Sequence, residues 1–407
     1  MSAFVWLDYS ERERRKMLDV VDLFREHDTR DELGIGSVRD AFADLLFPGT
    51  STIMTRARYF LLVAWIYQRQ EKSRTSSANI AARARKAEID LVEAIERSDD
   101  NEGNIGKVAK TTLKRLPSSV YWQGLSVWGI RTFRGAQSQY NRSLDRYYAQ
   151  LTRHGGRASE RDVEHDDLMS PNWHAGLVPP PPDFPTECSL SLMRPEAEYL
   201  AERIRLSLAS SGSLLAELVA QRQRCADVPF AWEHPYSAEL PPKLREMLDH
   251  AQNFSEVMHG APLLYNLVLA EQDHWDEGIT KYRLGLTDWA LLLSEHSRVL
   301  AKWDRERFWQ LVHAVNPRIT NPTYDFINTW WDLALAGDAA KLWESSTVRS
   351  LIRDRERRLK KSLARIGNPR AQELWTGDSG TAQLEFRWLI SQRLLGDIFN
   401  GLEAPDA

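Results

Sequence analysis

Basic and aromatic side chains alternate between residues 103 and 157, a combination that could bind nucleic acid. The segment holds ten basic residues and one acid, Asp145, a balance of +9, which leaves −13 for the rest of a 407-residue chain that carries −4 overall. Basic side chains neutralise phosphates, and aromatic faces can stack on unpaired bases. Interleaved positive charge and aromatic rings therefore favour a nucleic-acid-binding surface. The aromatic members are Tyr121, Trp122, Trp128, Phe133, Tyr140, Tyr147 and Tyr148.

Two helices predicted inside this segment have the proportions of a helix-turn-helix. The first covers 107–116 and the second covers 119–130, with Pro117 and Ser118 between them. The second helix would present its first residues where such motifs contact bases and phosphates. In the alternative interpretation, the aromatic residues belong to a core and the lysines only solvate the first helix. The expected nucleic-acid contacts are Lys107, Lys110, Lys114, Arg115, Ser119, Tyr121, Trp122, Arg131 and Arg134.

Two further stretches are strongly basic. Residues 54–87 contain eight basic residues and one acid, and Arg56 and Arg58 lie around a predicted helix start, where a phosphate could bind. An ordinary capping loop is the alternative for this hydroxyl-rich region. Residues 347–370 contain nine basic residues and two acids, and we expect a solvated helix face there.

No secure catalytic or metal-binding signature is present. Two Glu-x-x-His pairs, Glu256 with His259 and Glu271 with His274, have the spacing of di-iron ligands. A glycine and a proline at 260 and 262 are expected to end the first helix, so the two pairs would not meet. We expect no metal, no cofactor and no enzymatic activity. The alternative is an unrecognised nuclease or metalloenzyme that uses scattered residues, such as the acidic pair at 166–167.

Helical patterning covers nearly the whole chain, so we predict an all-α protein. The segment 155–192 differs, because it holds six prolines, four of them consecutive at 179–182, which cannot be helical. We predict a basic helical lobe at 1–154, a Pro-rich linker at 155–192 and an acidic, Trp-rich helical lobe at 193–407. The predicted helices include 10–26, 37–47, 55–71, 77–97, 105–116, 119–130, 137–151, 214–224, 242–258, 263–271, 286–315, 324–336, 347–366 and 383–399.

Location and partners follow from composition. The opening residues lack the pattern of a signal peptide, and the longest apolar run, 59–67, is far shorter than the roughly 20 residues of a membrane-spanning helix. Only two cysteines are present, Cys188 and Cys225, which fits a reducing cytoplasm. We expect a cytoplasmic protein without membrane contact. Trp330 and Trp331 are candidate anchors for a protein partner, because Trp is enriched at interface hot spots.

Five blocks of the sequence resemble a bacterial family of unknown function, family 6361. The resemblance extends over nearly the whole chain and implies a subunit of a DNA-directed antiviral defence system. Members of the family are often encoded beside helicases, methyltransferases or phospholipase-D-like proteins. The resemblance supplies no catalytic residue. The blocks are WLDYSERERRKML, DELGIGSVRDAFADLLFPGTSTIMTRARYFL, KRLPSSVYWQGLSVWGIR, FSEVMHGAPLLYNLVLAE and NPRAQELW.

The expected function is therefore a non-enzymatic, nucleic-acid-binding subunit that also contacts other proteins of a defence complex, with DNA as the favoured ligand. The alternative is a scaffold in which the basic segment meets an acidic protein surface instead of nucleic acid. The scaffold alternative predicts a stable protein complex and no affinity for nucleic acid.

Overall fold

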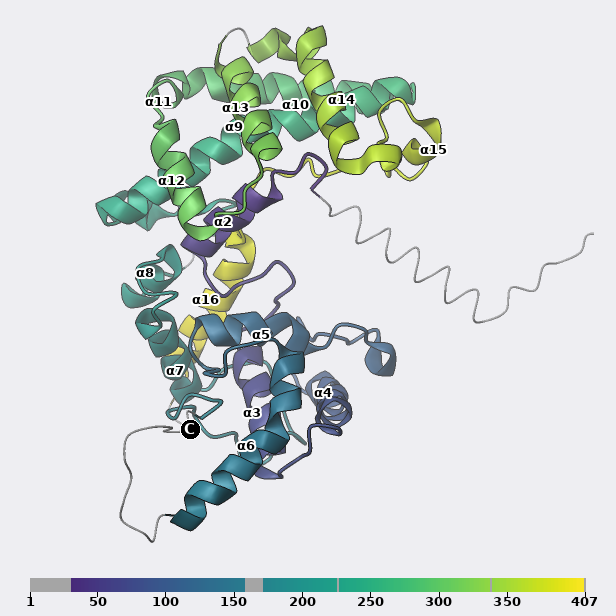
Figure 1. The fold of residues 1–407 in the computed structure, drawn as a ribbon. Helices are drawn as coiled ribbons and strands as arrows, with labels where there is room; N and C mark the ends of the chain where they lie inside the picture. Colours follow the sequence, from purple (N-terminus) through teal and green to yellow (C-terminus); the bar gives the residue numbers. More distant parts are fainter. Residues whose placement is uncertain (1–30, 158–170, 225–226, 337–338, 406–407) are drawn as a thin grey trace, which may run out of the picture. The chain divides into compact units, whose positions relative to one another are not determined.

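A computed structural model describes residues 31–157, 171–224, 227–336 and 339–405 (Figure 1). Within these ranges the chain forms α-helices and short 3-10 helices and no β-strand, with one isolated bridge between Arg131 and Trp173. The all-α prediction is confirmed. In this part of the chain, no helix is both long and apolar enough to cross a membrane. The helix predicted at 10–26 lies outside the described residues.

The chain forms two compact units. The first unit combines Met1–Phe42 with Asp249–Leu384, and the second combines Ala43–Leu248 with Glu385–Ala407. The lobe limits inferred from the sequence, at 154 and 193, both fall inside the second unit. The described part of the Pro-rich segment, 171–192, also belongs to that unit and buries Trp173, Leu190 and Leu192.

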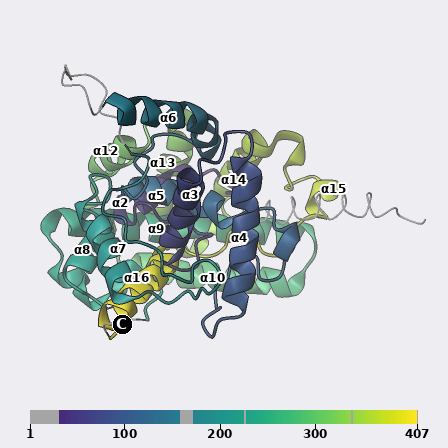
Figure 2. The same cartoon turned by 90° about the horizontal axis from the view of Figure 1, so that it is seen from below.

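The second unit is organised around α3. The first nine residues of this helix, 59–67, are all buried, as expected for a helix that is apolar on every side. Helices α3 and α4 lie side by side (Figure 2), and α5 also packs on α3. Helix α7 packs against α8 and α16. The helices of this unit are α3 (Tyr59–Lys72), α4 (Ile80–Glu96), η1 (Lys110–Thr112), α5 (Pro117–Val127), α6 (Gln137–Arg157), α7 (Arg194–Leu206), α8 (Leu214–Ala220), η2 (Ala231–Glu233), η3 (Pro235–Glu239) and α16 (Trp388–Glu403).

The first unit has an aromatic core. The Trp303 and Trp331 rings stack with their centroids 3.4 Å apart, and Phe308 lies 5.6 Å from Trp331. The prediction of a single helix at 286–315 is wrong, because the chain forms parts of three helices there. The last of them begins at Arg305 and is capped by Asp304, whose carboxylate accepts from Arg307 N at 2.9 Å. The remaining helices are α2 (Gly36–Leu46), α9 (Pro242–Gln272), α10 (Asp276–Glu295), α11 (Ser297–Leu300), α12 (Arg305–Val315), α13 (Asn321–Leu335), η4 (Ala339–Glu344), α14 (Ser346–Lys360), η5 (Lys361–Leu363) and α15 (Pro369–Gln372).

The predicted helix break after residue 259 is wrong, because α9 continues through Gly260 and Pro262. A proline inside a helix removes one backbone hydrogen bond and disturbs the carbonyl groups of the preceding turn. Two indole groups contact that turn. Trp289 Nε1 donates to the carbonyl of residue 256 at 2.8 Å, and Trp330 Nε1 donates to the carbonyl of residue 257 at 2.9 Å. These tertiary hydrogen bonds attach the turn before the proline to α10 and α13, although the carbonyl that Pro262 leaves without a helical donor is that of residue 258.

The predicted helix-turn-helix lacks its first helix, because residues 107–116 contain only the short η1. Gly106 and Lys110 have positive φ angles of 95° and 45°, which interrupt a right-handed helix. The following proline then holds Leu116 in an extended conformation with ψ of 154°. The second helix does form, as α5, with Pro117 in its first turn.

Candidate nucleic-acid interface

The predicted aromatic contacts, Tyr121 and Trp122, are core residues. Tyr121 is 0% exposed, and its hydroxyl accepts hydrogen bonds from the backbone N–H groups of Thr55 and Arg56. The Trp122 ring packs edge-to-face against Tyr140 with centroids 5.3 Å apart. Neither ring can stack on a base in this fold. The structure therefore has the arrangement of the alternative interpretation, in which these aromatic residues belong to a core.

Arg56 and Arg58 are also engaged inside the second unit. The Arg56 guanidinium binds Asp100 at 2.8 and 2.9 Å and Asp397 at 2.9 and 3.0 Å, and it lowers the pKa of the Asp100 carboxyl. Arg58 Nη2 donates to Glu196 at 2.7 Å, and its side chain is 6% exposed. Both arginines thus neutralise carboxylates of this chain rather than a phosphate.

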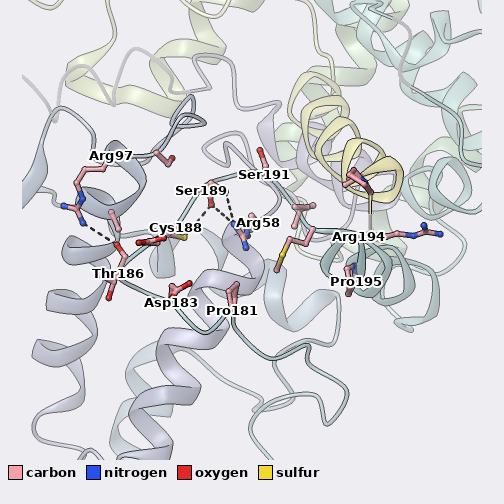
Figure 3. A pocket seen from close by; sticks show the side chains of 17 residues that line it. Arg58, Arg97, Pro181, Asp183, Thr186, Cys188, Ser189, Ser191, Arg194 and Pro195 are labelled. Atoms are coloured by element: carbon pink, nitrogen blue, oxygen red, sulfur yellow. Dashed lines mark hydrogen bonds between the residues drawn. The ribbon is translucent and has the colours of Figure 1, made fainter. Parts of the chain in front are cut away.

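A pocket of about 800 Å³ lies beside Arg58, between the end of α4 and residues 181–195 (Figure 3). Arg58 Nη1 donates to the Ser189 carbonyl at 3.1 Å, so the guanidinium fixes the pocket wall. Burial raises the pKa of the Cys188 thiol to about 11, which keeps the sulfur protonated near neutral pH. The pocket therefore contains no activated cysteine nucleophile.

Arg131 is another predicted contact that is buried. It is 2% exposed, and its guanidinium lies 4.6 Å from the centre of the Trp122 ring. Its Nη2 donates to the Trp122 carbonyl at 3.1 Å. Burial lowers the pKa of this guanidinium to about 10. Arg131 is therefore part of the packing between α5 and the following loop.

The other predicted contacts are exposed on the surface. Four of them lie in the loop 103–116, which runs beside α4. Lys110 pairs with Glu96 at 3.3 Å, and α4 also presents Asp90 and Glu93 to solvent. Glu96 thus offsets the charge of Lys110, whereas Arg85 of the same helix adds positive charge beside the loop, because its Nη2 donates to the Thr111 carbonyl at 3.2 Å. The exposed predicted contacts are Lys107, Lys110, Lys114, Arg115, Ser119 and Arg134, and their role stays a prediction.

The buried Glu88 anchors α5 next to this loop. It is 0% exposed, and its carboxylate accepts from Ser118 N and Ser118 Oγ, both at 2.7 Å. Burial raises the pKa of the Glu88 carboxyl from an ordinary value of 4.5 to about 7. The same helix carries an exposed carboxylate at Glu93.

We expect the free energy of unfolding to fall as pH rises from about 4.5 to about 7, because the unfolded chain releases the Glu88 proton first. The full effect is up to about 3 kcal/mol. The substitution Glu88→Gln should flatten this dependence, whereas Glu93→Gln should leave it unchanged. Urea unfolding at several pH values measures both. An unaltered pH profile in Glu88→Gln would show that Glu88 is not the titrating group.

The clearest unneutralised positive surface lies on α6. Three arginines lie on one face of this helix: Arg146 and Arg153 follow Arg142 by 4 and 11 residues. At 100° and 1.5 Å per residue, the three lie within about 40° of one another around the helix axis and extend over about 16 Å of its length. All three are exposed, and none forms an ion pair with any residue in the described ranges. Arg74 adjoins them, since its Nη1 donates to Thr152 Oγ1 at 3.1 Å. We call these four residues the α6 arginine surface.

The opposite face of α6 fixes the helix to the unit. Tyr140 and Leu144 are 0% exposed, and the Tyr140 hydroxyl donates to Glu71. Glu71 also accepts from Trp173 Nε1 at 3.0 Å, and burial raises the pKa of its carboxyl. The acid Asp145, which lies beside the arginines in the sequence of α6, accepts from Ser77 N at 2.9 Å. The sequence analysis included these arginines in the charge balance but did not select them as nucleic-acid contacts, although their helical spacing alone places them on one face of α6.

Three of the four residues of the Glu-x-x-His pairs have other partners. Glu256 Oε2 lies 2.7 Å from His296 Nδ1, and His259 Nε2 lies 3.0 Å from the Thr381 carbonyl. Glu271 pairs with Arg349. Among the residues that the structure describes, no group of three or more His, Cys, Asp or Glu side chains could hold a metal ion. The acidic pair at 166–167 lies outside them.

The predicted partner anchors, Trp330 and Trp331, are buried in the first unit at 0% and 1% exposure. Trp330 donates to α9 as described above, and the Arg305 guanidinium lies 4.6 Å from the Trp331 ring centre. The interpretation of these residues as surface anchors is corrected accordingly. They are large apolar side chains that the core requires.

A family model described as a family of unknown function (DUF6361) matches residues 1–401. No curated protein and no solved structure matches the chain. Residue roles must therefore come from the geometry of the chain itself.

Proposed function

The chain belongs to the family of unknown function DUF6361, and we propose from its own geometry that it binds duplex nucleic acid, DNA in particular, through the α6 arginine surface. The observation that carries the proposal is the row of exposed arginines without acidic partners among the described residues. Elsewhere in the same unit, Arg56 and Arg58 are matched with carboxylates. A polyanion would supply the charge that α6 lacks.

A phosphate backbone suits this surface better than single bases. Arginine presents a planar fork of donors that binds phosphate oxygens in pairs. A single-strand-binding protein also needs exposed aromatic platforms. Here the rings of Tyr121, Trp122 and Tyr140 are buried, and those of Phe133 and Tyr147 are only partly exposed. The ligand proposed is therefore a duplex that is held by its phosphates with little dependence on sequence.

The biological setting belongs to the same proposal. The family resemblance implies gene neighbourhoods of antiviral defence, and a DNA-binding subunit without catalytic machinery of its own would fit a complex whose other subunits act on DNA. The resemblance supports this setting by association only. It predicts that a strain lacking the chain loses protection from phage, and that a chain altered at α6 does not restore it.

We expect fluorescence anisotropy to detect binding of a 20-base-pair DNA duplex, with an affinity that falls steeply as salt rises. Four phosphate contacts give a slope of log affinity against log salt of about −3 to −4. Two unrelated duplex sequences should bind equally, and a single strand of the same length should bind more weakly. Absence of duplex binding at 50 mM salt would reject the proposal and favour the scaffold alternative.

A further inference from the structure

A second set of exposed cations lies on α14 and on the residues that follow it, in the first unit. Leu359 and Leu363, which neighbour them, are 41% and 65% exposed. The only exposed acid between Arg353 and Arg370 is Asp354. None of the cations forms an ion pair with another residue in the described part of the chain. We call this set the α14 cationic surface: Arg353, Arg357, Arg358, Lys361 and Arg370.

The other basic residues of the same stretch are used inside the unit. Arg355 donates to the Leu33 carbonyl at 2.7 Å, and Arg365 pairs with Glu32 at 3.1 Å. Lys360 pairs with Glu32 and, at 3.1 Å, with Glu356. Within the described residues, the inward cations of this stretch therefore bind carboxylates or backbone carbonyls, and the outward ones have no carboxylate partner.

The inward contacts also hold α14 rigidly. Glu356 is 0% exposed, and its carboxylate accepts from Tyr265 Oη at 2.7 Å and from the backbone N–H groups of Arg365 and Ile366 at 2.8 and 2.9 Å. Val348 and Ile352 are buried on the same side. The core thus fixes the backbone from which the outer cations project, so that binding does not have to order the helix itself.

We propose that the α14 cationic surface is a second contact for the phosphate backbone, so that each compact unit carries its own site for the duplex. The inference rests on the function proposed for the α6 arginine surface. Four of the five cations are arginines, the side chain suited to phosphate. Two linked sites raise the affinity for a long duplex through effective concentration, without any new contact within either site.

The test compares the variant R353E/R357E/R358E with the wild-type chain on 12- and 60-base-pair DNA duplexes. On the long duplex we expect at least a tenfold loss of affinity and a salt slope smaller by about 2 to 3. A short duplex can occupy either surface, so we expect the number of short duplexes bound per chain to fall from two to one. The variant R298E/K302E/R318E makes the same charge change at exposed residues of the same unit and should retain both properties.

The outcomes separate the two proposals. If the α14 variant keeps the wild-type affinity for the long duplex and the same number of short duplexes, the second site is rejected while binding through α6 stands. If the wild-type chain binds no duplex, both proposals fail. Because exposed leucines adjoin the cations, binding to vesicles that contain anionic phosphatidylglycerol is measured as well. Loss of vesicle binding with unchanged duplex binding would assign α14 to a membrane surface and overturn the proposal.

Discussion

Reversing three arginines of α6, in the variant R142E/R146E/R153E, is expected to weaken binding of a 12-base-pair DNA duplex to the α6 site by about 100-fold at low salt, which leaves one short duplex bound per chain, at the α14 cationic surface. Each glutamate removes a phosphate contact and adds repulsion at the same position, so the loss should apply to all sequences and reduce the salt slope by about 3. The three side chains are exposed and lie opposite the buried Tyr140 and Leu144, so the fold should persist. Anisotropy titration measures the affinity, and circular dichroism checks helicity.

The loop 103–116 supplies the matched control. K110E/K114E/R115E makes the same change in net charge within the same unit, at residues that the sequence analysis selected. We expect a loss of only about threefold, because acids of α4 such as Glu96 already reduce the potential there. A large loss in the loop variant with none in the α6 variant would place the interface on the loop. Equal losses would indicate a general effect of net charge.

Local patterns predicted much of the helical fold. The nine-residue apolar run at 59–67 predicted the buried helix α3, whereas the helix predicted from residue 119 begins earlier, with Pro117 in its first turn. The same local signals failed where distant groups decide the outcome. Glycine and proline at 260 and 262 indicated a helix end, but indole donors from Trp289 and Trp330 support the carbonyls of that turn. No window of neighbouring residues contains that information.

Charge counted along the sequence has the same limitation. Arg56 contributes to a basic stretch, yet its partner Asp397 is 341 residues away. Within the stretch 103–157, cations and aromatics alternate along α6 because helical periodicity places the rings of Tyr140 and Tyr148 inward and the arginines outward. Periodicity therefore identifies the exposed arginines, whereas the pairing of Arg56 and the burial of Trp122 require the tertiary structure.

The substitution Trp330→Ala is expected to lower the free energy of unfolding by about 3 to 5 kcal/mol, because it empties a fully buried site and removes a donor to α9. Trp330→Phe keeps most of the ring and loses the hydrogen bond, so a cost of about 1 kcal/mol is expected. The exposed Leu291 on α10 provides the control, and Leu291→Ala should change stability by less than about 0.5 kcal/mol. Urea unfolding followed by circular dichroism measures all three.

This series also distinguishes a core tryptophan from a docking anchor. An anchor for a partner contributes to association and adds little to the stability of the isolated chain. If Trp330 were such an anchor, Trp330→Ala would have the same free energy of unfolding as the wild type and would lose only the affinity for the partner. A core residue that supports α9 across Pro262 gives the reverse, a less stable chain. The Phe variant should then fall between the wild type and Trp330→Ala, because packing at this position contributes more than the single hydrogen bond to the turn before the proline.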